Sequence, residues 1–392
     1  MKYLIALLGL AIVFGLALLV SSNRKGIKLK PLAVMLVLQL VLGFILLNTS
    51  FGYIVIRGVA KVFEKLLSYA AIGIDFVFGG LANEGAQPFF INVLLPIVFI
   101  SALIGILQFT KILPLLMRGI GFVLSKVNGM GRLESYNAVA SAAIGQSEVF
   151  ITVKKQIGQL PANRLYTLCA SAMSTVSMSI VGAYMTMVEP KYVVTAIVLN
   201  LFGGFMIVSI INPYTVDPEE DILEIVEEKQ TFFEMLGEYI MDGFKVAIIV
   251  GAMLIGYNAL IGMVNDIFLM VLNISFQEIL GYIFAPFAFI MGIPWAESVS
   301  AGSVMATKLI TNEFVAMLSL PEYSKEFSER TLGIVSVFLI SFANFSSIGI
   351  IAGAVKGLND RQGSVAASFG LKLLYGATLV SVLTAIVVSV LL

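Results

Sequence analysis

Two carboxylates stand out in this 392-residue chain because the residues around them are mostly apolar. Glu148 ends the run GQSE, and Glu313 ends the run TNE. A charged residue at the centre of a membrane helix costs about 2.5–3.5 kcal/mol on insertion scales, so such residues usually face a cavity and act on a substrate or an ion. The plainer interpretation is that each carboxylate lies at the end of a hairpin and reaches water.

Neutral polar groups accompany the two carboxylates. Gln146 and Ser147 precede the first one, and Asn344 lies with Phe342 in a polar interruption further along the chain. An amide both donates and accepts hydrogen bonds, which suits the edge of a nucleobase. A carboxylate accepts charge-assisted hydrogen bonds, which suits sugar hydroxyls. Phe342 adds an apolar face to this set of groups.

The composition is that of an integral membrane protein. Apolar residues make up 59% of the chain and charged residues 12%, against roughly 25% charged residues in an average soluble domain. The mean hydropathy is +1.00, and a soluble protein of this size cannot hide so much apolar surface. The sequence therefore predicts an all-α polytopic membrane protein.

Three features of the composition exclude classes of chemistry and of partner. There is no histidine, which excludes imidazole metal sites and Ser-His-Asp triads. The single cysteine forms no intrachain disulfide, and 24 basic residues balance 24 acidic ones, so no nucleic acid partner is expected. We expect no cofactor and no metal site.

Eight spans of membrane length follow from the hydropathy pattern. They cover residues 3–21, 31–49, 89–110, 164–188, 191–212, 241–263, 331–355 and 366–391. The basic loop with Arg24, Lys25, Lys28 and Lys30 is cytoplasmic by the positive-inside rule, which places both termini outside. Residues 51–80 and 115–127 are instead predicted to be helices that lie in the membrane interface.

Two further segments, 134–160 and 294–321, are predicted to be re-entrant hairpins. Each arm has only about ten residues, too few to span, and polar residues break each segment near its middle. Two ordinary helices with a polar face are the alternative. Each hairpin is followed by an arginine and by a span with a polar interruption, STVSMS or FANFSS. For Ser177 and Ser346 in these interruptions we favour helix packing through small residues.

A hairpin, an arginine and a span with a polar interruption thus occur twice in the same order. This recurrence indicates an inverted repeat, an arrangement used by secondary transporters. It divides the chain into four parts. They are a scaffold part at 1–110, a first transport repeat at 111–212, an acidic cytoplasmic linker with a scaffold helix at 213–265, and a second transport repeat at 266–392. The linker is expected to be solvated.

The runs GQSEVFI, STVSMSIVGAY, TNEFVAM and SFANFSSIGIIAGAVKGL resemble the signatures of concentrative nucleoside transporters of the bacterial NupC-type branch. The resemblance extends from the third span to the last. It implies a homotrimer with a mobile transport part that crosses the membrane as an elevator. It also implies a place in the bacterial cytoplasmic membrane, and nucleosides such as uridine, cytidine or adenosine as substrates.

The resemblance implies roles for individual residues as well. Gln146, Ser147 and Glu148 would face the nucleobase. The ribose would be bound by Glu313, Asn344 and Ser347, with Phe342 lining the pocket.

One departure from the family pattern concerns the coupling ion. Sodium-coupled members carry an asparagine where this chain has Ser141, and a main-chain carbonyl at the position of Ile144 helps to hold the ion. Thr175 and Val176 match the partner positions on the broken helix. Serine is shorter than asparagine, so we expect proton-coupled symport, with sodium-coupled symport as the alternative.

Without histidine the proton must be carried by a carboxyl group, for which Glu148 and Glu313 are the candidates. Two other classes of protein are alternatives to a symporter. A membrane enzyme would need a nucleophile or a metal ion beside the carboxylates, and neither pattern accompanies them. A solute-gated pore would pass substrate only downhill.

Overall fold

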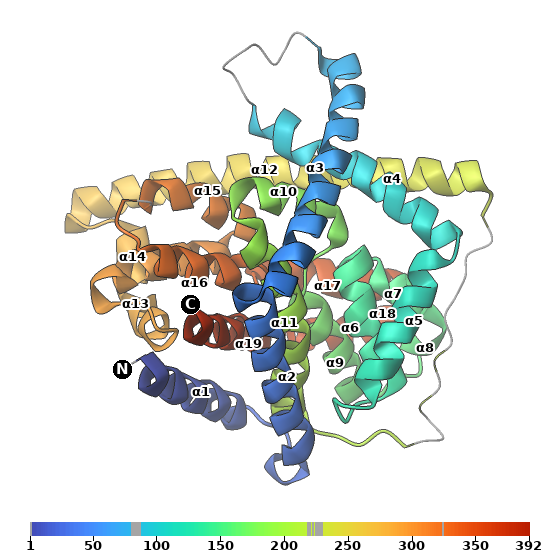
Figure 1. The fold of residues 1–392 in the computed structure, drawn as a ribbon, viewed down its shortest axis with the longest axis horizontal. Helices are drawn as coiled ribbons and strands as arrows, with labels where there is room; N and C mark the ends of the chain where they lie inside the picture. The colour runs from blue at the N-terminus through green and yellow to red at the C-terminus, as the bar shows by residue number, and fades with distance from the viewer. Residues whose placement is uncertain (1, 80–87, 218–220, 222, 224–229, 324) are drawn as a thin grey trace.

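The computed structural model describes residues 2–79, 88–217, 221, 223, 230–323 and 325–392. Within these residues the regular elements are all helices (Figure 1). Seven of the described helices are long and apolar enough to cross a membrane. The predicted all-α polytopic class is therefore confirmed. Most of the predicted acidic linker lies outside the described residues.

The N-terminal part contains five α-helices. α1 and α2 match the first two predicted spans, and α4, preceded by a short π-helix at Phe90–Leu94, matches the third. The segment predicted at 51–80 is the single helix α3, and the one predicted at 115–127 is α5. Their bounds are α1 Lys2–Leu19, α2 Leu29–Asn48, α3 Ser50–Phe78, α4 Pro96–Phe109 and α5 Ile112–Ser125. Their placement in the membrane interface stays a prediction.

Both predicted hairpins are present as pairs of helical arms. The first is α6 (Arg132–Ile144) followed by the short helices α7 (Val149–Thr152) and α8 (Lys154–Ile157). The second is α14 (Trp295–Ile310) followed by α15 (Glu313–Tyr323). In the second hairpin, Ser300 Oγ at the start of one arm donates to Glu326 Oε2 beyond the end of the other, at 2.7 Å. The chain therefore returns to its starting level within the second hairpin.

Two of the predicted spans are broken helices. The first is divided into α9 (Ala162–Met173) and α10 (Met178–Met187), and the second into α16 (Glu329–Leu339) and α17 (Phe345–Leu358). The two breaks touch, because Phe342 N donates to Thr175 O at 3.1 Å. The intact helices α11 (Pro190–Ile211) and α19 (Gly370–Leu391) pack against each other and against both α9 and α16. These helices form the buried centre of the molecule (Figure 1).

The remaining helices surround this centre. α12 (Phe232–Leu272) has 41 residues, so at 1.5 Å per residue it is about 60 Å long. It is much longer than the predicted span 241–263, because a capping box of Thr231 and Glu234 starts it early and Asn273 in the left-handed conformation ends it late. The predicted boundary between 265 and 266 consequently falls inside this helix.

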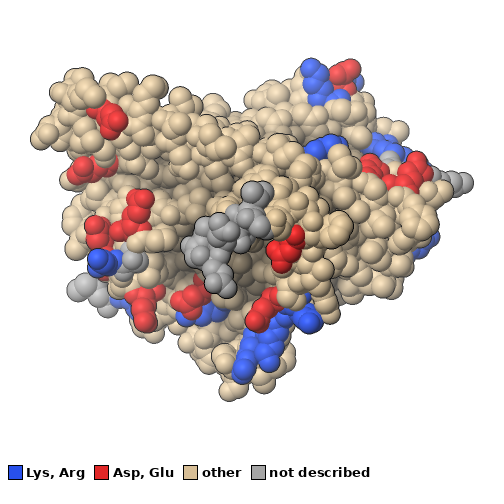
Figure 2. Space-filling view, turned by 90° about the horizontal axis from the view of Figure 1, so that it is seen from above, with Lys and Arg blue, Asp and Glu red and all other residues tan. Residues whose placement is uncertain are grey.

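Two more helices complete the described fold. α13 (Phe276–Ile290) meets α14 at a bend of 116°, and α18 (Asp360–Ser368) follows α17. Figure 2 shows that one face of the molecule is broadly uncharged, with acidic and basic side chains in small groups. This surface agrees with a chain whose charged groups are few and whose apolar helices face lipid.

Candidate substrate-binding site

A cavity of about 740 Å³ lies where the hairpin tips, the helix breaks and the helices α4 and α12 meet. Its volume is within the range of about 300–1,000 Å³ that is usual for small-molecule sites. All the residues predicted to bind the nucleobase or the ribose line it, together with Phe342 and Ile144 of the remaining candidates. They are Gln146, Ser147, Glu148, Glu313, Asn344 and Ser347.

The tip of the first hairpin is shaped by Gly145. Its φ of +118° is a conformation that favours glycine, and a Cβ atom there would lie 2.6 Å from Glu148 Oε2. Glu148 Oε2 accepts a hydrogen bond from Ser147 Oγ at 3.0 Å. Gln146 is 8% exposed, and its Oε1 atom has no hydrogen-bond partner in the described part of the chain. This tip therefore presents a carboxylate and an unsatisfied amide oxygen to the cavity.

The tip of the second hairpin holds a more enclosed carboxylate. Glu313 is 3% exposed, and its Oε1 atom accepts a hydrogen bond from Tyr184 Oη at 2.7 Å. Its Oε2 atom accepts one from Asn344 Nδ2 at 3.1 Å. The other end of the same amide, Asn344 Oδ1, caps helix α17 by accepting from Ser347 N at 2.9 Å. Asn344 therefore fixes the position of Glu313 relative to the helix break.

Ser347 lines the same cavity and is 1% exposed. Its Oγ atom has no hydrogen-bond partner among the described residues. A buried hydroxyl without a partner carries a desolvation penalty, so a ligand that bonds it would gain free energy. Ser177 and Ser346 were expected to pack helices, but both line the cavity. Their hydroxyls are bonded locally, Ser177 Oγ to Ser179 Oγ at 2.8 Å and Ser346 Oγ to Asn344 Oδ1 at 2.7 Å, and a role in helix packing stays a prediction.

Tyr184 is a functional candidate that the sequence analysis missed. It lies in α10, is fully buried and packs against Phe314 with ring centroids 5.0 Å apart. An aromatic residue in an apolar run ordinarily belongs to the core, so its type alone carried no signal. The available signal was the hydroxyl, since a buried tyrosine needs a hydrogen-bond partner.

The remaining ion-coupling candidates are buried beside the cavity and do not line it. Ser141 Oγ donates to Asn137 O of its own helix at 2.7 Å. Thr175 contributes its carbonyl to the contact between the two breaks, and Val176 is 1% exposed. No group of three His, Cys, Asp or Glu side chains in the described ranges could hold a metal ion.

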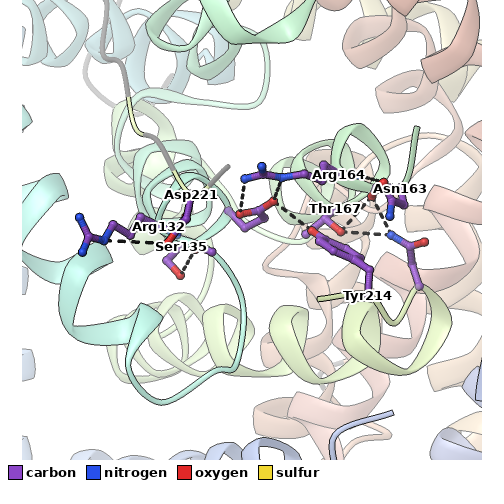
Figure 3. A network of polar contacts seen from close by, with 10 residues as sticks. Arg132, Ser135, Asn163, Arg164, Thr167, Tyr214 and Asp221 are labelled. Carbon is purple, nitrogen blue, oxygen red and sulfur yellow. Dashed lines mark hydrogen bonds and ion pairs between the residues drawn. The ribbon is translucent and has the colours of Figure 1, made fainter. Parts of the chain in front are cut away.

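A buried ion pair holds the base of the first hairpin (Figure 3). Arg164 Nε donates to Glu134 Oε1 at 2.6 Å, and the two side chains are 7% and 0% exposed. Tyr214 Oη donates to the same carboxylate at 3.1 Å, and Asp221 Oδ1 accepts from Arg132 N at 2.6 Å. Tyr214 and Asp221 follow α11, so at these two residues the predicted linker binds the hairpin and is not merely solvated.

Three family models cover nearly the whole chain. Residues 8–81 match a model described as the N-terminus of Na⁺-dependent nucleoside transporters, and residues 192–389 match the corresponding C-terminus. Residues 90–191 match a model described as nucleoside recognition.

Curated relatives agree with these matches. The chain is 36% identical over 393 residues to the purine nucleoside transport protein NupG of Bacillus subtilis, with 99% of each chain covered. It is 28% identical over 403 residues to the nucleoside permease NupC of Helicobacter pylori, with 97% of this chain and 96% of the permease covered.

Solved structures resemble the fold closely. The inward-facing, substrate-bound state of CNTnw matches with a TM-score of 0.94 at 29% identity, covering 100% of this chain and 99% of the other. An outward-facing variant of the same protein also matches with a TM-score of 0.94, at 30% identity, covering 100% and 98%.

Proposed function

This chain belongs to the concentrative nucleoside transporter family and transports nucleosides, and from that premise we propose that it is a proton-coupled importer. The observation that carries the proposal is the pair of tip carboxylates, Glu148 and Glu313, on one cavity between two helix breaks. Broken helices that meet near the midplane are where secondary transporters bind their substrates. The protein is a transporter and not an enzyme.

In the proposed complex the nucleobase lies at the first tip. The Gln146 amide and the Ser147 hydroxyl there can donate and accept hydrogen bonds, and the Glu148 carboxylate can accept them. The ribose lies at the second tip and donates its hydroxyls to Glu313. Two observations support a ligand that reaches both Gln146 and Ser347. Gln146 Oε1 and Ser347 Oγ are buried without partners in the described chain, and a bound nucleoside would satisfy both. Uridine, cytidine and adenosine are the substrates to test first.

Proton coupling is supported by Ser141. Its hydroxyl donates to Asn137 O at 2.7 Å, so it is already hydrogen-bonded within helix α6. A serine there also reaches less far toward an ion than an asparagine. Because the chain has no histidine, a carboxyl group at the tips is the proposed proton carrier. Such a group couples the transport of the proton to that of the nucleoside if the carrier crosses the membrane only when both are bound or when neither is bound.

Sodium coupling is the second candidate. The family models that match both ends of the chain are described as Na⁺-dependent. Uptake into proteoliposomes under a pH gradient alone and under a sodium gradient alone separates the two. We expect accumulation with the pH gradient, and accumulation driven by sodium alone would refute proton coupling.

We further propose an elevator mechanism in a homotrimer in the bacterial cytoplasmic membrane, with both termini outside. Similarity to structures of one transporter in inward- and outward-facing states supports the elevator. Long apolar faces on α3 and α12 support the trimer, because exposed residues such as Phe51, Ile54 and Ile255 need lipid or protein partners. The basic loops support the orientation.

A further inference from the structure

A lysine side chain is buried between the second hairpin, the second broken helix and α19. Lys308 lies in the last turn of α14 and is 0% exposed. Its Nζ atom donates to Phe338 O at 2.6 Å, to Ser341 Oγ at 2.7 Å and to Ser381 Oγ at 3.2 Å. The Phe338 ring adds a cation–π contact, since its centroid lies 4.5 Å from Nζ. We call the three acceptor atoms the oxygen cage.

The hydrogen bonds around Lys308 are those of a charged ammonium. Phe338 O can only accept a hydrogen bond. Ser381 Oγ donates to Ala377 O at 3.3 Å, and Ser341 Oγ lies 2.8 Å from Ser381 Oγ, to which it can donate. With their protons placed in this way, both hydroxyl oxygens accept from Nζ. An ammonium has three donors and no acceptor, so it matches the cage in the number of bonds and in the direction of donation.

The oxygen cage has the composition of a site for a monovalent cation. Phe338 belongs to the last turn of α16, where helix carbonyls lack partners within the helix and the helix dipole is negative. Ser341 lies in the break between α16 and α17, and Ser381 lies in α19. A buried charge needs such ligands to offset the loss of its hydration. Lys308 delivers the charge to the cage on a covalent tether.

The oxygen cage also fixes the helix break that carries part of the candidate site. Beyond Ser341 the break continues to Phe342 and Asn344, which both line the cavity. Asn344 Nδ2 donates to Glu313 Oε2 at 3.1 Å, and Glu313 begins α15, the helix that follows α14. The contacts therefore form a closed ring, which runs from Lys308 through the break to Asn344 and Glu313 and returns along the chain to Lys308. Lys308 does not itself line the cavity.

We propose that the oxygen cage is a monovalent-cation site that the chain fills with its own ammonium, and that Lys308 is thereby a positioning residue for the ribose. The inference rests on the proposed binding of the ribose at Glu313. The cage needs no dissolved ion, because its cation stays attached to the chain throughout the transport cycle. When the tether is removed, the cage takes a small alkylammonium ion from solution.

Chemical rescue tests the cage in the purified full-length protein. Lys308→Ala removes Cγ, Cδ, Cε and Nζ, which are the heavy atoms of propylammonium. The adenosine affinity of this variant, measured by calorimetry, should fall roughly tenfold or more because the cage loses its charged donor. Propylammonium should return it close to the wild-type value. Tetramethylammonium, which has a charge but no N–H donor, should restore nothing. An affinity that propylammonium leaves low overturns the inference.

Two further variants separate the charge from its volume and from general effects of the amine. Lys308→Met fills the same space without a donor, so its adenosine affinity should be low with and without propylammonium. Wild-type affinity in Lys308→Met overturns the need for a charge. Lys191 forms an exposed ion pair with Glu189, and Lys191→Ala should keep the wild-type affinity in both solutions. A response of Lys191→Ala to propylammonium overturns the assignment of the rescue to the cage.

The positioning role predicts that the loss depends on the ribose. 2′,3′-Dideoxyadenosine lacks the hydroxyls that are proposed to bond Glu313, so its affinity should fall less than that of adenosine in Lys308→Ala. An equal loss for both ligands is the result of general damage to the fold and overturns the positioning role. Ser341→Ala removes one ligand of the cage and gives the same comparison if Lys308→Ala does not fold.

Failure of this inference differs from failure of the proposed ribose site. Glu313→Gln with wild-type affinity for adenosine refutes the ribose site itself. Reduced affinity in Glu313→Gln, together with wild-type affinity in Lys308→Ala, leaves the ribose site in place and overturns the role of the cage.

Discussion

Tyr184 in the first repeat donates a 2.7 Å hydrogen bond to Glu313 in the second, and both side chains are buried. This bond joins α10, the second half of the first broken helix, to the tip of the second hairpin. It leaves Glu313 with one oxygen bonded to Tyr184 and the other to Asn344. The carboxylate is therefore fixed in place before a nucleoside arrives, which reduces the ordering cost of binding.

Tyr184→Phe should weaken binding of ribonucleosides about tenfold or more. A hydrogen bond to a charged group contributes about 1.5–3 kcal/mol, and each 1.4 kcal/mol corresponds to tenfold in affinity. The loss should be largest for substrates whose ribose hydroxyls bond Glu313. Comparing the Kd of adenosine with that of 2′,3′-dideoxyadenosine checks this, and an equal loss for both would contradict the proposed ribose site.

Glu148→Gln and Glu313→Gln should each abolish concentrative uptake. The first removes one of the two carboxyl groups proposed to carry the proton, and the second replaces the acceptor for the ribose hydroxyls by an amide. Accumulation of uridine or adenosine in proteoliposomes under a pH gradient is the measurement. Glu189→Gln, which changes an exposed carboxylate at the start of α11, serves as the control. If both tip variants still accumulate nucleoside, the site is elsewhere.

Gly145→Ala should lower nucleoside affinity by roughly tenfold. Gly145 has a φ of +118° and a ψ of 171°, a region that is essentially restricted to glycine and that costs other residues about 1–3 kcal/mol. The added Cβ would also lie 2.6 Å from Glu148 Oε2, so the carboxylate must move. Gly119→Ala in α5 is the matched control, because a Cβ there has nothing within 4 Å. The nucleoside Kd of each variant tests this prediction. Equal affinities in the two variants would contradict the requirement for glycine at the first tip.

The sequence revealed the two tips because they contrast with their surroundings. Glu148 and Glu313 are charged residues in apolar runs, and glycine or polar residues interrupt the helices there. Tyr184 gave no comparable signal, and neither did Lys308, a fully buried lysine of α14 whose Nζ atom donates to Phe338 O, Ser341 Oγ and Ser381 Oγ. The acceptors of Lys308 lie 30, 33 and 73 residues away in the chain, and the partner of Tyr184 lies 129 residues away. Only tertiary packing brings such groups together.

Separating the buried pair of Glu134 and Arg164 should destabilise the protein strongly. Removing one partner of a buried ion pair leaves an uncompensated charge and costs about 3–5 kcal/mol, so Glu134→Gln and Arg164→Met should each lower Tm markedly. The double variant should be less unstable than the sum of the two, because neither charge remains. Breaking the exposed pair of Glu189 and Lys191 should cost at most about 1 kcal/mol. Thermal melting of the purified variants tests this, and additive losses would mean that the pair does not interact.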